Sequence, residues 1–413
     1  MTSKLFWLSL LAVLALSPAL IAADDILLAK GERVQGELTG GAGGWKLGNA
    51  TIRTADVLCV RFSPEPPPTG MANGVFIRGG SLISGTLAAI IGDTAEVSST
   101  AVGMLKLKRE DIAGYIAPLP AGQSENRPEL ARYATLLSSA LGTSDAVLQP
   151  GKRTVVHMAN LDQLLAERVM RVGSEQILIK TKDKATDPVN RNYVRVLEIE
   201  TPPAAAPTPD DERLGPEYIV RLKGGDLLRG RVVKLTADAL TLKTTFMGEK
   251  VLERRVLAVM FSAAAPGSGV TWLSGVKPAK SVHVPMFDSE FPARMDSSVG
   301  RHDMQIGTLP IERGIGVHSK SEIEFALNGQ PSRFVALAGI DASTKGRGQV
   351  IARVLADGKE VWKSQAIAGN DEAQVIGVDL GPAKTLTLVV DYGPDGDDSG
   401  DHFNWGWAAV VGK

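Results

Sequence analysis

Gly314-Ile-Gly-Val-His-Ser319 and Asp401-His-Phe-Asn-Trp-Gly-Trp407 bracket the stretch that decides the fold of the C-terminal part of the chain. Between them, apolar residues alternate with charged or small ones, which is the period of a half-buried strand. Asp357-Gly358 separates two apolar runs and is typical of a two-residue hairpin turn, because both turn positions need positive φ. Short strands separated by turn residues predict a β-sandwich. The alternating positions are Ile323, Phe325 and Leu327, then Leu386, Leu388 and Val390.

Six short segments of this region follow the order that they have in one known family. They are Val270-Thr-Trp-Leu-Ser274, Gly314 to Ser319, Phe334-Val-Ala-Leu-Ala-Gly-Ile-Asp341, Val354-Leu-Ala-Asp-Gly358, Val378-Asp-Leu-Gly381 and Asp401-His-Phe-Asn-Trp405. On these segments, residues 268–413 resemble the NPCBM family of carbohydrate-binding modules. The resemblance implies a galactose-binding-like jelly-roll β-sandwich, a carbohydrate ligand and, as often in that fold, a structural calcium ion. The sequence departs from the family pattern at Gly275 and at Trp405-Gly-Trp407.

The composition is that of a folded chain rich in turns. Hydrophobic residues make up 44% and charged residues 22%, with 44 Gly and 23 Pro, which suits short strands better than long helices. The formal net charge is -1, so no field of one sign would attract nucleic acid or an anionic membrane. We therefore expect no nucleic-acid partner.

The N-terminus has the plan of a secretory signal. Lys4 precedes the apolar run Leu5 to Leu16, and small residues up to Ala23 precede Asp24-Asp25, so residues 1–23 are expected to be a cleaved signal peptide. An uncleaved anchor is the alternative, but the run is short for a bilayer core of about 30 Å. We expect a secreted or periplasmic protein with no transmembrane segment after cleavage. Its single cysteine, Cys59, cannot form an intrachain disulfide.

The middle of the chain contains repeats. Leu227 to Thr244 matches Leu164 to Thr181 at its apolar positions without a gap, and weaker copies begin at Ile26 and Val75. The repeats predict small β units at 24–63, 73–120, 150–200 and 215–263, each with five short strands that loosely resemble the Sm-like small β-barrels. Units of this size are expected to pack on one another or to pair edge to edge.

The linker sequences between the repeats support this division. A Pro-rich linker spans 201–214, and Pro64 to Pro68 separates the first two units. Residues 127–142 have the apolar spacing of a connecting helix and end at Gly142. Asn160 to Val172 fits either a helix or strands, and its match to the fourth unit favours strands.

The sequence shows no catalytic motif. A His-Glu-x-x-His zinc motif, a Gly-x-Ser-x-Gly elbow and a phosphate-binding Gly-Lys-Ser/Thr loop are all missing. A barrel enzyme needs about 250 residues, and the units together with the sandwich leave no such block unassigned. A carboxylate pair between domains remains open, but no pair is nominated by the sequence. The expected role is therefore non-catalytic.

Candidate binding residues lie at the end of the chain. Trp405 and Trp407 are two apart, so on a regular strand they share one face, where an indole could stack on a sugar ring. Asp401, His402 and Asn404 would offer polar partners to hydroxyl groups, and His318 could line a pocket at a loop end. The alternative is that the tryptophans fill the core and that His318 is a buried structural residue.

The acidic loop near residue 397 is the candidate calcium site. Asp395, Asp397 and Ser399 alternate and are followed by Gly400, as in the first half of a calcium loop. A solvated acidic turn is the alternative, because Gly406 stands where a bidentate Glu would complete the loop. No other cofactor is expected.

Two functions follow from these observations. The first is an exported non-catalytic protein that recognises glycan through the C-terminal sandwich. The second is a structural or protein-interaction protein of the cell envelope, whose sandwich has lost sugar binding. The departures from the family pattern favour the second, and the signal peptide together with the resemblance favours the first.

Overall fold

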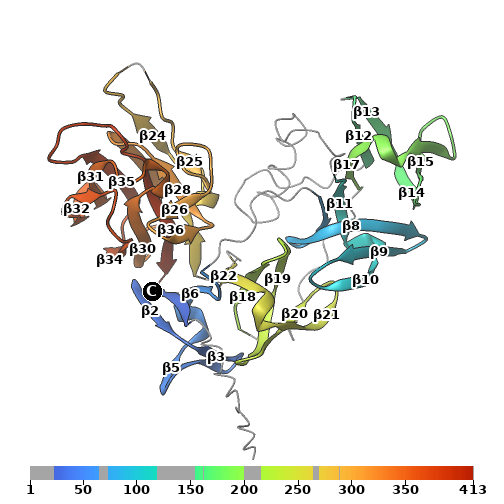
Figure 1. The fold of residues 1–413 in the computed structure, drawn as a ribbon, viewed down its shortest axis with the longest axis horizontal. Helices are drawn as coiled ribbons and strands as arrows, with labels where there is room; N and C mark the ends of the chain where they lie inside the picture. The colour runs from blue at the N-terminus through green and yellow to red at the C-terminus, as the bar shows by residue number, and fades with distance from the viewer. Residues whose placement is uncertain are drawn as a thin grey trace, which may run out of the picture.

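The computed structural model describes residues 23–64, 73–118, 154–160, 162–199, 215–263, 269–287 and 289–412. Within these ranges every named element is a β-strand or a three-residue 3-10 turn (Figure 1), which confirms the mostly β prediction. None of these ranges contains a helix long and apolar enough to cross a membrane. The predicted helix at 127–142, the linker at 201–214 and nearly all of the predicted signal peptide lie outside the described residues.

Four units of the same plan precede the sandwich. In each unit the first strand pairs with both the second and the last, and a 3-10 turn precedes the last strand. Asn160 to Val172 contributes strands, as the repeat match favoured. Unit 1 (24–61) has β1 Asp24–Leu28, β2 Glu32–Gly36, β3 Leu38–Gly41, β4 Gly44–Leu47, β5 Ala50–Ile52 and β6 Val57–Arg61; unit 2 (74–116) has β7 Gly74–Ile77, β8 Ser81–Ile91, β9 Thr94–Ser99, β10 Gly103–Lys108 and β11 Ile112–Ile116. Unit 3 (154–198) has β12 Thr154–Met158, β13 Gln163–Ala166, β14 Arg168–Val172, β15 Gln176–Lys180, β16 Asp187–Asn190 and β17 Val194–Glu198; unit 4 (217–262) has β18 Glu217–Leu222, β19 Leu227–Leu235, β20 Ala239–Thr244, β21 Gly248–Glu253 and β22 Leu257–Ser262.

The closed barrel expected for each unit is not confirmed. Among the described residues, no ladder joins the strand before the 3-10 turn to the strand after it. A backbone hydrogen bond at the turn recurs instead. The N–H groups of Arg109, Arg191 and Arg254 donate to the carbonyls of Asp93, Glu175 and Asp238, each sixteen residues earlier, at 2.9, 2.9 and 2.7 Å.

The units associate through their last strands. β6 of unit 1 pairs with β22 of unit 4, and β11 of unit 2 pairs with β17 of unit 3. A second contact joins each pair, β3 with β19 and β8 with β14, and a bridge between Leu227 and Leu82 links the two pairs. In Figure 1 the pair of units 2 and 3 therefore lies to one side of the pair of units 1 and 4. Edge-to-edge pairing removes strand edges that would otherwise be open to aggregation.

The C-terminal sandwich consists of two antiparallel sheets that enclose their own apolar core. Asp357 and Gly358 have φ of 48° and 77° and join β31 to β32, which confirms the predicted hairpin turn. One sheet has the order β25-β28-β36-β30-β34, with β23 beside β36; the other has β24-β29-β35-β31-β32, with β33 beside β31. The strands are β23 Val270–Trp272, β24 Lys280–His283, β25 Arg294–Met295, β26 Met304–Ile306, β27 Leu309–Ile311, β28 Gly314–Val317, β29 Ser321–Ala326, β30 Ser332–Ile340, β31 Gln349–Ala356, β32 Lys359–Lys363, β33 Ile367–Ala368, β34 Gln374–Gly381, β35 Thr385–Tyr392 and β36 Phe403–Gly412.

A second apolar core joins the sandwich to the units. We call it the joint: it combines Phe261 of unit 4 and Leu27 of unit 1 with Trp272, Val335 and Trp407 of the sandwich. The ring centroid of Trp407 lies 5.3 Å from that of Phe261 and 5.6 Å from that of Trp272. The sandwich is therefore packed against the repeats through a continuous core.

A buried ion pair crosses the same joint. Arg61 Nη2 of unit 1 lies 2.5 Å from Glu312 Oε2 of the sandwich, and both side chains are 6% exposed. Arg61 Nη2 also donates to the carbonyl of Pro310 at 2.6 Å. Because each charge would be costly alone in this environment, the two sides of the joint are held in one register.

Candidate functional site

Trp405 and Trp407 lie in different cores. Trp405 is fully buried inside the sandwich, whereas Trp407, at 2% exposure, lies in the joint. The two indoles do not share a face, so that prediction is wrong. The physical reason is an irregularity of β36: Trp407 has φ of 50° and donates its N–H to the carbonyl of Arg313, and the register with β30 shifts between Val335 and Leu337. Neither ring offers an open plane to a sugar, so both are core residues.

The other predicted residues come together at one end of the sandwich. β28 pairs with β36 so that Val317 faces Phe403, and this register brings the next residues outward, His318 and His402, close together. Their ring centroids lie 5.5 Å apart. His283, at the end of β24, joins them at 5.6 Å from His318.

Phe291 completes this aromatic cluster, although no sequence pattern had marked it as a site residue. Its ring stacks on His318 with a centroid distance of 4.3 Å and an interplanar angle of 11°. Its backbone N–H donates to His283 Nδ1 at 3.2 Å, which ties the loop after β24 to the cluster. His318 is 3% exposed, whereas Phe291 and His402 are half-buried. His283 is half-buried as well, so the open aromatic surface at this end is that of Phe291, His402 and His283.

Three polar atoms beside the cluster are buried without a hydrogen-bond partner: Asp401 Oδ2, His402 Nδ1 and Asn404 Oδ1. The opposite atoms of two of these side chains are fixed, since Asp401 Oδ1 accepts from the Gln349 N–H at 2.9 Å and Asn404 Nδ2 donates to Asp341 Oδ2 at 2.7 Å. Buried polar groups almost always have partners. Orphaned atoms held by such contacts are prepared for a ligand or water at this end.

Burial sets the charge of the cluster. It raises the pKa of Asp401 to about 6, although the neighbouring Ser319 side chain and the Gln349 N–H oppose this shift. Burial and the neighbouring imidazoles lower the pKa of His318 to about 4, and burial lowers those of His283 and His402. At neutral pH the three rings are therefore uncharged and can exchange hydrogen bonds with hydroxyl groups.

The acidic loop makes its own turn. Asp397 Oδ1 accepts from the backbone N–H groups of Asp398 and Ser399 at 2.7 and 3.0 Å. Asp395, Asp397 and Ser399 are exposed. Nowhere in the described ranges do three His, Cys, Asp or Glu side chains converge as a metal site. The loop thus has the features of the solvated turn that was the alternative to calcium binding.

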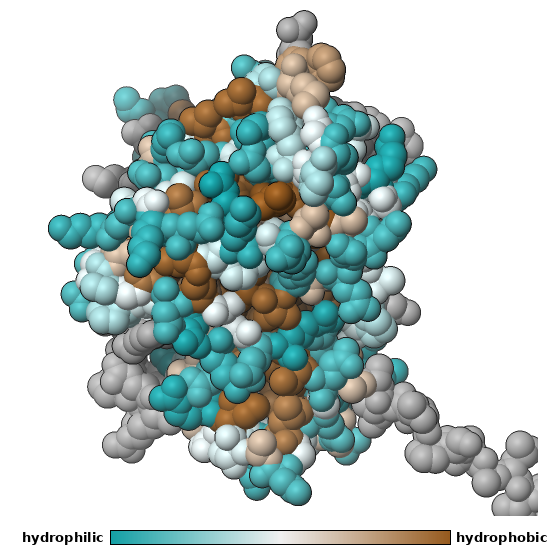
Figure 2. Space-filling view, turned by 90° about the vertical axis from the view of Figure 1, so that its left-hand side faces the viewer, coloured by the Kyte–Doolittle hydropathy of each residue, from teal (hydrophilic) through white to brown (hydrophobic). Residues whose placement is uncertain are grey.

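The loop after β24 projects beyond the strands of the sandwich (Figure 1). It carries exposed apolar side chains, with Phe287 at 74% and Val284 at 57% exposure. The face of the molecule that bears the sandwich is otherwise largely hydrophilic, with separate hydrophobic patches (Figure 2). A projecting apolar loop next to orphaned polar atoms has the mixed chemistry of a ligand site.

Comparison with known proteins finds similarity to a protein that is named as an enzyme and to solved carbohydrate-binding modules. A protein of Renibacterium salmoninarum that is named as an endo-alpha-N-acetylgalactosaminidase is 36% identical to this chain over 87 residues. These residues are 21% of this chain and 6% of that protein. A solved structure of the CBM51-2 and INT domains of Clostridium perfringens ZmpB is 24% identical, with a TM-score of 0.32, over 35% of this chain and 31% of that one. The CBM51 module of Clostridium perfringens GH95, solved with methyl-galactose, is 23% identical, with a TM-score of 0.32, over 34% of this chain and 99% of the module.

The family comparison covers the same region. The NPCBM/NEW2 domain model matches residues 269–411, which contain both sheets of the sandwich, the aromatic cluster and the sandwich side of the joint. Residues 269–411 of this chain are therefore an NPCBM/NEW2 domain.

Proposed function

We propose that this protein is an exported, non-catalytic carbohydrate-binding protein that recognises glycan at the end of the sandwich formed by His318, Asp401, His402, Asn404 and Phe291. The observation that carries the proposal is the set of orphaned buried polar atoms beside an aromatic surface within an NPCBM/NEW2 domain. A sugar presents an apolar ring face and a rim of hydroxyl groups. The aromatic surface can contact the ring face, and the buried polar atoms can hydrogen-bond to the hydroxyl groups.

The half-buried ring of Phe291 takes the stacking role that the tryptophans cannot fill. It is held flat on His318 and by its N–H bond to His283, so little side-chain entropy is lost when a ligand lands on it. Asn404 Oδ1 and Asp401 Oδ2 accept hydrogen bonds, and His402 Nδ1 either donates or accepts. Hydroxyl groups can satisfy all three atoms.

The absence of catalysis is part of the proposal. Asp401 Oδ1 is engaged by Gln349, and Asp341 is engaged by Asn404, Gln305 and Ser343, so these carboxylates act as structural acceptors. The Renibacterium salmoninarum protein that is named as an enzyme matches this chain over only 6% of its own length. Secretion, or release into the periplasm, rests on the signal-like residues 1–23.

A structural or interaction role in the cell envelope is the second candidate. It is favoured by the joint, where Trp407, a position at which the sequence departs from the family pattern, contacts the units. It is also favoured by the exposed apolar side chains Leu165 and Met170 of unit 3, at 60% and 40% exposure. Exposed apolar side chains of this kind suit a protein partner.

The test is a glycan array probed with the full chain. The isolated sandwich is unsuitable because its removal would expose Trp272, Val335 and Trp407 of the joint. We expect a glycan hit that Phe291→Ala and His402→Ala each weaken about tenfold or more, since each removes a stacking plane or a buried hydrogen bond. His157→Ala is the matched control, because His157 lies in unit 3 with Glu198 as its partner at 2.6 Å.

The possible outcomes separate the two functions. Binding that both site variants lose, while they keep the thermal stability of the parent, supports the glycan site. Silence on the array, or a hit that the control variant weakens equally, rejects it and leaves the interaction role.

A further inference from the structure

The four units form a row whose order in space differs from their order along the chain. Units 1 and 4 pair through their last strands, and so do units 2 and 3. Leu227 of unit 4 pairs with Leu82 of unit 2, which joins the two pairs through their second strands, β19 and β8. The row therefore runs unit 1, unit 4, unit 2, unit 3. Figure 1 shows the sandwich beside unit 1 and β13, the second strand of unit 3, at the opposite end of the row.

The strand ladders define equivalent positions on the four second strands. In every unit the pairing of the first strand with the last shifts register after one residue, and the equivalent position is the residue opposite it on the second strand. These positions are Arg33, Leu82, Gln163 and Leu227. Glu167, between β13 and β14, is an additional residue of unit 3, so the ladders differ here by one position from the gapless sequence match. The contact between units 2 and 4 thus joins equivalent residues, as a two-fold axis does.

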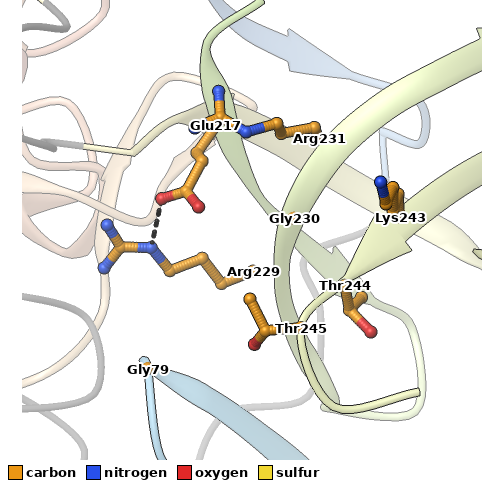
Figure 3. A pocket seen from close by; sticks show the side chains of 8 residues that line it. All are labelled: Gly79, Glu217, Arg229, Gly230, Arg231, Lys243, Thr244 and Thr245. Carbon is orange, nitrogen blue, oxygen red and sulfur yellow. Dashed lines mark hydrogen bonds and ion pairs between the residues drawn. The ribbon is translucent and has the colours of Figure 1, made fainter. Parts of the chain in front are cut away.

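This contact between second strands extends beyond the one bridge. Asp226 Oδ1 accepts from the Ser84 N–H at 3.1 Å, and Ser81 Oγ accepts from the Arg229 N–H at 2.9 Å. Beside it, Gly79 of unit 2 and Arg229 of unit 4 line a cavity of about 250 Å³ (Figure 3). The second strand and the turn before it therefore both take part in joining the units.

Unit 3 presents the same backbone groups outward. The Met158 N–H donates to the Asp162 carbonyl at 2.8 Å, and unit 4 has the equivalent bond at 2.9 Å. Hydrogen bonds alternate between successive pairs of an antiparallel ladder, so the N–H and C=O of Gln163, the next residue, point away from β12. Those of Leu227 point toward unit 2 in the same way. The outer side of β13 therefore has the pairing pattern that unit 4 uses.

In three of the units the chain itself covers this edge. Units 2 and 4 cover one another, and the turn before β2 in unit 1 lies against the sandwich. There Arg333 Nη1 donates to the carbonyl of Lys30 at 2.9 Å, and a Cβ on Gly31 would lie 2.2 Å from the Cα of Gly377. In the described part of the chain, by contrast, β13 pairs with β12 alone.

The uncovered edge of unit 3 carries exposed apolar side chains. Leu164 is 38% exposed, whereas its equivalents Leu228 and Ile83 are fully buried. Leu165 is 60% exposed, and Tyr193, at 59%, lies beside the turn between β12 and β13. An open strand edge with apolar side chains favours pairing with another chain.

We propose that two copies of this chain form a two-fold symmetric dimer, in which β13 pairs antiparallel with β13 of the partner subunit and Gln163 lies opposite Gln163 of the partner subunit. A second copy fits because the chain already joins two equivalent edges, Leu82 to Leu227, and a two-fold interface must complement itself. The same register places Asp162 beside the N–H of Leu165 of the partner subunit, as Asp226 lies beside that of Ser84. The dimer carries a sandwich at each end; joint binding of one polysaccharide by both would rest on the proposed function, whereas the dimer does not.

The experiment is sedimentation equilibrium of the full chain over roughly 1 to 500 µM, because a contact through a four-residue strand is small and a micromolar dissociation constant is expected. Leu165→Lys places a charge on the edge, which opposes pairing. Val251→Lys is the matched control, since Val251 is 63% exposed on β21, which pairs only with β20 among the described strands. Circular dichroism and melting temperature establish that each variant is folded.

A cysteine crosslink tests the register. Gln163→Cys would place two thiols opposite each other across the axis, at a Cα separation of about 5.5 Å that a disulfide can span. The native Cys59 is buried, so it does not compete. Val251→Cys is the control for chance collisions.

We expect the parent and Val251→Lys to dimerise equally, Leu165→Lys to raise the dissociation constant tenfold or more, and Gln163→Cys alone to give a disulfide-linked dimer on mild oxidation. A parent that is monomeric over the whole range would overturn the proposal and leave this edge to a different protein. Equal effects of Leu165→Lys and Val251→Lys, or no Gln163→Cys crosslink beyond that of Val251→Cys, would overturn it too. Phe291→Ala should leave the mass unchanged, so the dimer and the glycan site fail separately.

Discussion

Replacing Trp407 with alanine should separate the unfolding of the sandwich from that of the four units. The indole is 2% exposed and packs on Phe261 of unit 4 and Trp272 of the sandwich. A buried tryptophan removes roughly 150–250 Å² from water. At about 25 cal/mol per Å² this amounts to about 5 kcal/mol, and measured Trp→Ala substitutions in cores cost about 3–5 kcal/mol. That loss is comparable to the free energy that keeps a typical domain folded, about 5–15 kcal/mol.

Differential scanning calorimetry of the full chain is the assay. The parent protein should unfold in one main transition, because the joint couples its two sides, whereas Trp407→Ala should give two. Trp405→Ala is the control: it removes the same side chain two residues away, but from the core within the sandwich. It should lower the melting temperature while the joint stays intact. The reasoning is refuted if the parent already shows two well-separated transitions, or if both variants give the same profile.

Three further predictions concern buried charge. Glu312→Gln should lower the free energy of unfolding by about 3–5 kcal/mol, because it leaves Arg61 buried without its counter-charge. Urea denaturation should show that the double variant Arg61→Met/Glu312→Leu is more stable than Glu312→Gln. The reverse order of stability would contradict this explanation. Burial raises the pKa of Asp226 to about 6, so the folded protein holds this proton more tightly than the unfolded chain does. The free energy of unfolding should therefore fall as pH rises from about 4 to about 6. Asp226→Asn should flatten this part of the plot of stability against pH, and an unchanged slope would count against the role of Asp226. The pKa of His318 is lowered to about 4, so its contribution to stability is fully present above pH 6.5 and is lost as pH falls toward 4. The melting temperature should decline over that range, whereas glycan binding by the folded protein should weaken only as pH approaches 4. His318→Gln should weaken the pH dependence of the melting temperature, and an unchanged dependence would argue against this role of His318.

The sandwich could be predicted because its strands and turns have clear local sequence patterns. Ile323 and Phe325 of the alternating run lie in β29, which ends one residue before Leu327, and Asp357-Gly358 makes the hairpin turn that its residue types favour. The repeat match placed strands rather than a helix at 163–172. These features depend on neighbours along the chain, which a sequence displays directly.

The candidate site was only partly accessible to the same reasoning. His318 and His402 meet because β28 pairs with β36, and the family segments contained both residues. Phe291 lies in a loop without periodicity, so nothing in its neighbourhood marked it. Trp407 was misplaced because a positive φ at a tryptophan is rare, and the parity rule for strand faces assumes a regular strand. The partner of each unit was likewise hidden, since edge pairing joins residues far apart in sequence.

An arginine at the first position of the 3-10 turn nevertheless stabilises both pairs of units. Arg254, first in the 3-10 turn of unit 4, donates to the carbonyl of Leu38 in unit 1 and to Asp24 Oδ2. Arg191, first in the 3-10 turn of unit 3, donates to the carbonyls of Leu87 and Ala88 in unit 2 at 2.5 and 3.2 Å. Backbone carbonyls impose no demand on the partner's side chains, so the same arginine can hold two different neighbours, and repeats that have diverged in sequence keep one geometry of pairing. That geometry positions β6 and β22 side by side under the sandwich, where Arg61 and Phe261 meet Glu312 and Trp407. Arg254 therefore supports the joint from a distance, and Arg254→Gln should loosen it without touching any residue of the sandwich.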